Sequence, residues 1–469
     1  MPIIPLPLLK GSQVDTSADY RDYLPINVLP IPEPAPNSNG YFTNHPGIEL
    51  KVTLSGGVSN GGVYNAQDGI LYRLIGANLY GNNQLLSTTG ALGRASFAYS
   101  PNSVAFTGSN GKGYYWNGSA LSEFKNWQPG ESPQGITNYQ IDGIIDVTRN
   151  LGRYIWLTAK SFIVTDLQNE QRPDFVAPIY SAESDPDDNV AVTVWSDFVV
   201  VLGRNSTEFF RLTGDAELIY AAQRSLVIQF GCISTHAKTA FMGGIAVVGS
   251  ARNEPPSVAL LAGNGMQKLS TPEIDKVLQT YNDSTLQGAV LESGVWRGMN
   301  LLYVHLPLET LVYVAQSQTW VKLKSGTGNA RWTGIDVIYN AATGKTEVGD
   351  KGSGKVGEFT RLMSQYGVKQ EAYLQTPLVK IGKASLYDLT IDTVSGFGAD
   401  PVLLSISATE NGYTYSAEQT MQLNAPYDYT SYPIISRVGG IRDKIGFRLR
   451  IVSGESINVS GFTVRAENG

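Results

Sequence analysis

Arg153-Tyr-Ile-Trp-Leu-Thr-Ala-Lys-Ser-Phe-Ile-Val164 combines a short apolar strand, a turn and a second apolar strand, with aromatic residues in the strands. The same pattern recurs from about Val63 to Phe359, and the other copies start at Tyr72, Val104, Val192, Leu301 and Ile335. Their starts are unevenly spaced, at intervals that bracket the roughly 40–45 residues of one propeller blade. We therefore predict a β-propeller of about six blades with degenerate repeats.

The composition favours an all-β protein. The chain has 469 residues, of which 42 % are hydrophobic and 16 % charged, with 50 glycines and 25 tyrosines. Glycine permits the positive φ angles of hairpin turns, and tyrosine suits a half-buried pleated surface. A chain of this length buries one continuous core only if repetition extends that core around a ring.

The pattern changes after about residue 365. Leu386–Val394 and Ile445–Val452 alternate cleanly between apolar and polar residues, and Pro401–Ala408 is a third long apolar strand. Such alternation is typical of strands with one buried and one solvated face. We predict three parts: an extended arm over 1–55, a propeller over 56–365 and an antiparallel β-sandwich over 366–469.

The predicted arm is rich in proline, which favours extended geometry, and is too apolar for a solvated linker. It must lie on a surface of its own chain or of a neighbouring copy. Within it, an apolar cluster supplies the candidates for contact between subunits: Tyr20, Tyr23, Leu24, Ile26 and Leu29.

One helix is predicted inside the propeller, over Ser270–Tyr281. Thr271 can cap it with its hydroxyl, Pro272 suits the first helical position, and apolar residues recur on one face.

Charge, cysteine content and hydropathy restrict the class of protein. The formal net charge is −6, so the chain as a whole does not attract nucleic acid. The single cysteine, Cys232, is interpreted as a buried filler, and assembly in a reducing cytoplasm follows from the lack of disulfides. The N-terminus lacks the basic region of a signal peptide, and no apolar run is long enough to span a membrane, so we expect no membrane insertion.

The candidate motifs for chemistry are weak. Gly349-Asp-Lys-Gly-Ser-Gly-Lys355 has the spacing of a phosphate-binding loop, but Val356 replaces the magnesium-binding hydroxyl and a strand follows. His45, His236 and His305 are far apart in the sequence and lack zinc-site spacing. The acidic turn Asp185–Asn189 lacks the glycine and distal glutamate of a calcium loop. We expect no catalytic residue, no metal and no cofactor.

Tryptophans that stack on sugars would suit a sugar-binding or sugar-cleaving propeller, which is the alternative function. These residues recur with the repeat, so packing between blades is the simpler interpretation, and two carboxylates suitable for glycoside hydrolysis cannot be recognised by spacing alone. The tryptophans are Trp116, Trp127, Trp156, Trp195, Trp296, Trp320 and Trp332.

Basic residues gather near the C-terminus of this acidic chain. Arg448 and Arg450 fall on one face of a predicted strand, and Arg437, Arg442 and Lys444 lead into it. This basic stripe is either a solvated strand face or a contact for an acidic partner or for the phosphates of passing DNA.

Several segments, in order along nearly the whole chain, resemble the packaged-DNA stabilisation proteins, or tail hubs, of short-tailed lambdoid phages of enteric bacteria. No one segment is diagnostic, and the colinear set makes the resemblance specific. The clearest are Ala18–Leu29, Ser38–Ile48, Asp146–Tyr154, Phe162–Leu167, Ser206–Gly214, Ser364–Gly367, Leu404–Tyr413 and Arg437–Arg442.

The resemblance implies a structural role in the virion tail. Six copies would form a ring beneath the head-to-tail adaptor, itself under the portal, and close the DNA channel after packaging. The ring would carry the tail needle and the tailspikes, and DNA would later pass through it. No catalytic residue carries over from the family. Deleting residues 1–36 is predicted to leave the propeller folded but weaken assembly, and reversing the charges of Arg448 and Arg450 to impair docking on the adaptor.

Overall fold

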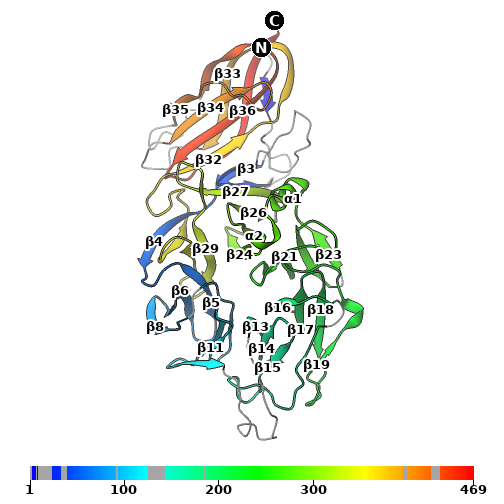
Figure 1. Cartoon of the computed structure of the whole chain (residues 1–469). Helices are drawn as coiled ribbons and strands as arrows, with labels where there is room; N and C mark the ends of the chain where they lie inside the picture. The colour runs from blue at the N-terminus through cyan, green and yellow to red at the C-terminus, as the bar shows by residue number, and fades with distance from the viewer. Residues whose placement is uncertain are drawn as a thin grey trace.

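A computed structural model describes residues 3–6, 8, 24–32, 40–90, 93–124, 143–182, 186–263, 265–394, 400, 402–423 and 434–468. Seven antiparallel sheets form a ring, and an eighth sheet folds into a sandwich beside it (Figure 1). The first strands of most successive blades contact one another around the axis, and the last blade contacts the first. The ring is thus a seven-bladed β-propeller, whereas the sequence predicted about six blades.

The first four blades follow one another along the chain, and blade 3 has only three strands. From the axis outward, the strands are β5(Ser59–Asn65), β6(Ile70–Ile75), β7(Asn78–Gly81) and β8(Gln84–Thr88); β9(Phe97–Tyr99), β10(Val104–Thr107), β11(Gly113–Trp116) and β12(Leu121–Phe124); β13(Ile144–Asn150), β14(Arg153–Thr158) and β15(Phe162–Val164); and β16(Asn189–Trp195), β17(Phe198–Gly203), β18(Thr207–Leu212) and β19(Tyr220–Ala222), followed by the short helix η1(Arg224–Leu226).

The last three blades are built in the same way, except that blade 7 takes its outer strand from the beginning of the chain. The strands are β20(Lys238–Phe241), β21(Gly244–Gly249), β22(Ser257–Ala262) and β23(Gly265–Lys268); β24(Val290–Trp296), β25(Met299–His305), β26(Thr310–Val314), β27(Thr319–Ser325) and β28(Ala330–Arg331); and β29(Gly334–Asn340), β30(Lys345–Asp350), β31(Lys355–Thr360) and β4(Gly47–Thr53).

Two-residue turns join the first two strands of several blades. Leu151-Gly152, Met242-Gly243 and Arg297-Gly298 have positive φ at both residues. This is the geometry of the type I′ turn, whose twist matches that of the flanking strands. Glycine at the second position is the local reason why these hairpins form.

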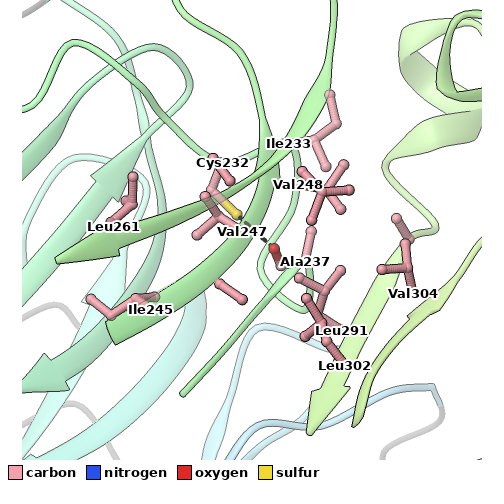
Figure 2. Packing of buried hydrophobic residues seen from close by; sticks show 14 of the residues in the cluster. Cys232, Ile233, Ala237, Ile245, Val247, Val248, Leu261, Leu291, Leu302 and Val304 are labelled. Atoms are coloured by element: carbon pink, nitrogen blue, oxygen red, sulfur yellow. Dashed lines mark hydrogen bonds between the residues drawn. The ribbon is translucent and has the colours of Figure 1, made fainter. Parts of the chain in front are cut away.

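Blade 5 is the blade that the sequence pattern did not reveal. Its four strands contain neither tryptophan nor tyrosine, the residues by which the repeat was recognised. Its core is instead aliphatic, with Ile245, Val247 and Leu261 packed around Cys232 (Figure 2). The Cys232 Sγ–H donates to Ala237 O at 3.5 Å, and burial raises the pKa of the thiol to about 11. Cys232 is therefore an inert core residue.

The C-terminal part is a β-sandwich in which long strands pass from one layer to the other. β36 pairs with β33 in its first half and with β34 and β32 in its second half. One apolar cluster fills the space between the layers. The strands are β32(Gln370–Gln375), β33(Val379–Val394), β34(Leu403–Thr409), β35(Gln419–Gln422), β36(Ile434–Ser453) and β37(Asn458–Asn468).

No separate N-terminal arm is seen in the described residues. β1(Ile3–Leu6) pairs with β37, and β2(Val28–Ile31) and β3(Tyr41–Asn44) extend the same sandwich sheet. β4 then pairs with β31 and closes the propeller. The proline-rich composition correctly indicated extended backbone, but sequence alone could not identify the strands that it pairs with.

The segment Pro25–Asn27 joins the propeller to the sandwich. The Ile26 N–H donates to Tyr373 O of β32 at 3.0 Å, and the Asn27 N–H donates to Lys322 O of β27 at 2.9 Å. The Asn27 side chain donates to Glu371 O at 2.7 Å and accepts from the Lys324 N–H at 2.9 Å. We call Pro25–Asn27 the clamp, because its hydrogen bonds bind one edge of each domain.

Two short helices lie between blades 5 and 6. α1(Pro272–Gln279) confirms the predicted helix, and Ile274 and Leu278 are buried. Thr271 precedes it as predicted, but its side chain makes no cap hydrogen bond. α2(Asp283–Leu286) was not predicted, and Asn282 caps it by accepting from the Thr285 N–H at 2.8 Å.

Candidate functional site

The second half of the predicted basic stripe is neutralised within the chain. Arg450 forms ion pairs with Glu418 at 2.5 Å and with Glu371 at 3.3 Å. The Arg448 guanidinium lies over the Tyr415 ring, 4.1 Å from its centroid, and 4.0 Å from a Glu418 oxygen. These two arginines therefore hold β35, β32 and β36 together.

The first half of the stripe lies where the strands cross between the sandwich layers. Lys444 is directly opposite Lys380, and Arg442 is opposite Ala384. Lys380 and Lys383 are exposed and Lys444 is half-buried. Arg437 lies on β36, and the side chains of Arg437 and Arg442 are outside the described part of the structure. We call Lys380, Lys383 and Lys444 the basic tip.

Of the five residues predicted to contact another subunit, three lie in the described part of the chain and two do not. Leu29 is fully buried between blades 6 and 7, Leu24 packs against the core of blades 5 and 6, and Ile26 belongs to the clamp. In this structure these three contact their own chain. Tyr20 and Tyr23 lie outside the described residues, so a contact between subunits remains a prediction for them.

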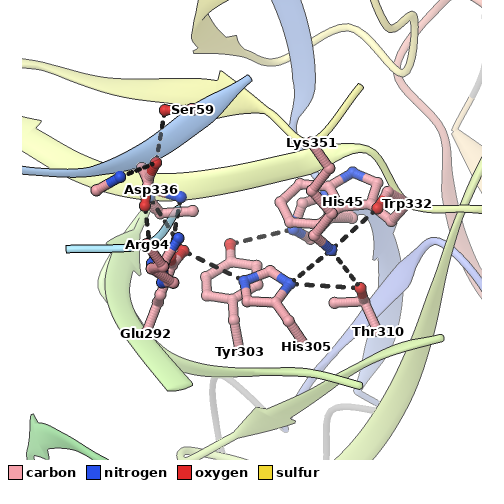
Figure 3. A network of polar contacts seen from close by, with 12 residues as sticks. His45, Ser59, Arg94, Glu292, Tyr303, His305, Thr310, Trp332, Asp336 and Lys351 are labelled. Carbon is pink, nitrogen blue, oxygen red and sulfur yellow. Dashed lines mark hydrogen bonds and ion pairs between the residues drawn. The ribbon is translucent and has the colours of Figure 1, made fainter. Parts of the chain in front are cut away.

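A buried polar network that sequence reasoning missed connects blades 1, 2, 6 and 7 (Figure 3). Glu292 lies 2.8 Å from Arg94 and accepts from the backbone N–H groups of Asp336 and Val337 at 2.9 and 3.1 Å. Asp336 lies 2.8 Å from the same arginine and accepts from Ser59 at 2.5 Å. Because each residue comes from a different blade, no local spacing could have revealed the cluster.

The network continues from Glu292 through His305 to Lys351. His305 Nε2 lies 3.2 Å from Glu292, and Lys351 Nζ lies 2.9 Å from His305 Nδ1. Lys351 also donates to Thr310 at 3.0 Å and to Trp332 O at 3.1 Å. Burial, with Arg331 next in effect, lowers the pKa of Lys351 to about 7. The motif that resembles a phosphate loop thus directs its first lysine inward, and its Asp350 accepts from Gly352 and Ser353 in a tight turn.

His45 sits between the two domains, in the link from β3 to β4. Its ring packs edge-on against Tyr303, Trp332 and Phe359, and Nε2 lies 3.1 Å from the Tyr303 hydroxyl. Burial lowers the pKa of His45 to about 3, and burial and Lys351 lower that of His305 to about 4. Burial opposes ionisation of Glu292, but His305 and Arg94 outweigh it and hold the pKa of its carboxyl well below normal.

We expect acid to destabilise this protein through these groups. In the unfolded chain both histidines bind protons below about pH 6.5, whereas in the folded chain His305 does so only below about pH 4 and His45 only below about pH 3. The free energy of unfolding therefore falls as the pH is lowered across that window. Glu292 adds to the loss below about pH 4.5. Urea unfolding at pH 7.5, 5.5 and 4.5 measures a loss on the order of several kcal/mol. His45→Gln with His305→Gln should reduce this dependence, with a remainder from His236, whose pKa burial also lowers. An unchanged slope would contradict the expectation.

Most tryptophans are packing residues. Trp156 and Trp320 are fully buried, and Trp116 and Trp332 are nearly so. Trp195 and Trp296 pack against core clusters from their edges, and Trp127 lies outside the described residues. The described tryptophans therefore do not form an aromatic platform for sugars.

Other candidate chemistry finds no support in the described residues. No group of three or more His, Cys, Asp or Glu side chains there could hold a metal ion. Asp187 and Asp188 of the acidic turn accept from Asn205 and pair with Lys160, respectively. Among the described residues, no helix is long and apolar enough to cross a membrane.

Comparison with known proteins gives consistent matches over both domains. The family model described as the β-propeller of bacteriophage P22 Gp10 matches residues 4–364, and that described as its β-sandwich matches residues 371–467. The tail hub protein gp10 of Salmonella phage P22 is 35 % identical over 480 residues, covering 100 % of both chains.

Solved structures match only at the level of the propeller. The β-propeller domain of Cps50 (Swd1) from Myceliophteria thermophila has a TM-score of 0.42 and 8 % identity, covering 66 % of this chain and 99 % of that one. The N-terminal domain of Nup159 has a TM-score of 0.40 and 9 % identity, covering 72 % and 99 %. Neither likeness carries an argument about function.

Proposed function

Because the chain belongs to the family of the bacteriophage P22 tail hub protein Gp10, we propose that six copies of it form a ring that closes the DNA channel of a short tail. The observation that carries the proposal is the full-length match to a tail hub, together with a fold of a propeller and a sandwich. Heterologous contacts between identical subunits generate a closed ring when their rotation closes. The ring would lie beneath the head-to-tail adaptor, retain packaged DNA and carry the tail needle and tailspikes.

The propeller itself is unsuited to conduct DNA. The pocket at its axis has a volume of about 300 Å³, and ion pairs of Arg94 with Glu292 and Asp336 join blades beside it. A duplex cannot enter such a pocket, so the DNA passage would lie between copies of the chain. The net charge of −6 suits a wall past which DNA slides without binding.

The experiment that tests the function is DNA retention in phage particles assembled without this chain. If the proposal is right, filled heads form and then lose their DNA, and supplying the chain restores retention. If heads stay full and only attachment to the host fails, channel closure lies in another protein. Sugar recognition would then be the function to test, by glycan binding to the isolated chain.

The basic tip is our candidate for docking on an acidic protein of the virion, such as the adaptor. Lys380 and Lys383 are exposed at this tip, and an acidic surface would attract their positive charges. Lys380→Glu with Lys383→Glu should weaken incorporation into tails by tenfold or more, measured by the amount of chain in purified particles.

The matched control for the tip is Lys276→Glu, on the exposed side of α1, where the lysine makes no ion pair with another described residue. It should leave incorporation unchanged. Equal incorporation of the tip variant and this control would mean that the tip only keeps the chain soluble. Arg448 and Arg450 are poor targets for the same test, because reversing them breaks ion pairs within the sandwich.

A further inference from the structure

The pocket at the propeller axis is polar and open to solvent. Residues from the inner edges of blades 1 to 6 line its volume of about 300 Å³. Such a space is large enough for a small ion with several waters, or for one side chain of another protein. What binds there depends on the groups that face it.

Two cations reach this pocket from different blades. Arg94 precedes β9 in blade 2, and Lys238 begins β20 in blade 5. Their side chains retain 21 % and 12 % of their surface exposed, whereas the carboxylates that pair with them, Glu292, Asp336 and Asp146, retain 9 %, 2 % and 0 %. In these ion pairs the arginine and lysine side chains are therefore more exposed to the pocket than the carboxylates.

The three carboxylates accept hydrogen bonds from backbone N–H groups as well as pairing with the cations, and Asp146 belongs to the lining of the pocket. Glu292 and Asp336 accept from backbone N–H groups of blades 7 and 1. Asp146 lies 2.7 Å from Lys238 and accepts from the Val192 N–H at 2.7 Å and from its neighbour Val147 at 2.9 Å. Hydrogen bonds of this kind stabilise the carboxylates, so that an anion in the pocket would meet the exposed surface of Arg94 and Lys238.

Threonine hydroxyls complete the lining. Thr148, Thr193 and Thr239 come from the inner strands β13, β16 and β20, and all three are partly exposed at the pocket. No hydrogen bond joins their side chains to another described residue. Three hydroxyl donors from adjacent blades thus face the same space as the two cations.

His236 borders the pocket and responds to the same cations. Burial, followed by the charges of Arg94 and Lys238, lowers the pKa of His236 well below its ordinary value. Its ring is therefore neutral at pH 7 and adds no competing charge. An anion bound beside it should offset the positive charges of Arg94 and Lys238 and so raise the pKa of His236. The protonation of His236 can therefore be used to detect a bound anion.

We propose that this axial pocket binds an oxyanion, either a phosphate group or a carboxylate, between Arg94, Lys238 and the hydroxyls of Thr148, Thr193 and Thr239. A phosphate would come from solution, whereas a carboxylate would come from solution or from an acidic side chain of another protein. The site is independent of the proposed hub function, because it needs no other copy of the chain.

Titration of the full-length chain with inorganic phosphate and, separately, with acetate tests the proposal. Binding is followed by calorimetry and by the His236 ring resonances at constant ionic strength. Saturable phosphate binding without acetate binding identifies a phosphate site, and saturable acetate binding identifies a carboxylate site. Absence of both up to about 50 mM overturns the proposal, since such an affinity would be weaker than any useful site.

Hydroxyl-deleting variants locate the bound anion. Thr148→Val and Thr193→Val keep the side-chain shape and should each weaken binding by about tenfold, the effect of one hydrogen bond to a charged group. Thr53→Val, on the exposed outer strand of blade 7, is the matched control and should bind as the unchanged chain does. Equal affinity of all three variants would show that an adventitious ion binds elsewhere, and would overturn the axial site.

Discussion

Deleting residues 1–36 is expected to destabilise the whole chain, with its unfolding midpoint in urea well below that of the intact chain. The deletion removes β1 and β2 from the sandwich sheet and the clamp from both domains. Val28 and Leu29, both almost fully buried, each contribute about 1.5–3 kcal/mol by burial alone. This expectation replaces the one drawn from the sequence, in which the propeller kept its fold without the arm.

Two controls separate the clamp from the rest of the deletion. Removing residues 1–8 takes away β1 but leaves the clamp, so a smaller loss is expected. Asn27→Ala leaves buried backbone groups of Lys324 and Glu371 without partners, at about 1–3 kcal/mol each, and places alanine at a φ of +57°. Asn27→Gly removes the backbone strain of the positive φ but does not restore the hydrogen bonds of the asparagine side chain. A midpoint unchanged by the 1–36 deletion would mean that neither domain depends on this segment.

The second large effect is expected from Glu292→Ala. Glu292 is buried and contacts Arg94, His305 and two backbone N–H groups. Its removal leaves Arg94 paired with Asp336 alone and the two buried N–H groups without their acceptor. Breaking one partner of a buried ion pair costs about 3–5 kcal/mol. Chemical unfolding measures the loss, and Glu292→Gln should recover part of it by keeping the side-chain shape.

The matched control for Glu292 is Glu123→Ala. Glu123 forms a surface ion pair with Lys112 at 2.8 Å, and both side chains are about half exposed. Such pairs contribute about 0–1 kcal/mol. A loss for Glu292→Ala no larger than for this control would show that the buried network contributes specificity rather than stability.

The propeller could be predicted from the sequence because its aromatic residues recur. Tyr72, Trp116 and Trp156 each lie in a strand and pack between blades. Blade 5 was missed because aliphatic residues such as Val247 form its core. The outer strand of blade 7 was missed because it lies more than 300 residues before its partner β31. Local patterns carry no information about such distant pairings.

The candidate site was predicted less well than the fold. The stripe at Arg448 and Arg450 was visible from strand alternation, but the neutralising Glu371 and Glu418 come from other strands. Arg94, Asp146 and Lys238 are unremarkable in sequence and meet only because the blades converge on one axis. The tertiary structure determines which charged side chains meet in this protein. Sequence spacing can predict only which charged residues share a face of the same strand.

The pairing of the first strands with the last has a consequence for synthesis. β4 meets β31 only after about three-quarters of the chain has left the ribosome, and β1 and β3 meet β37 only at its end. An incomplete chain therefore exposes unpaired strand edges at both domains, a ready target for proteases and chaperones. Only a finished chain can therefore close both its propeller and its sandwich.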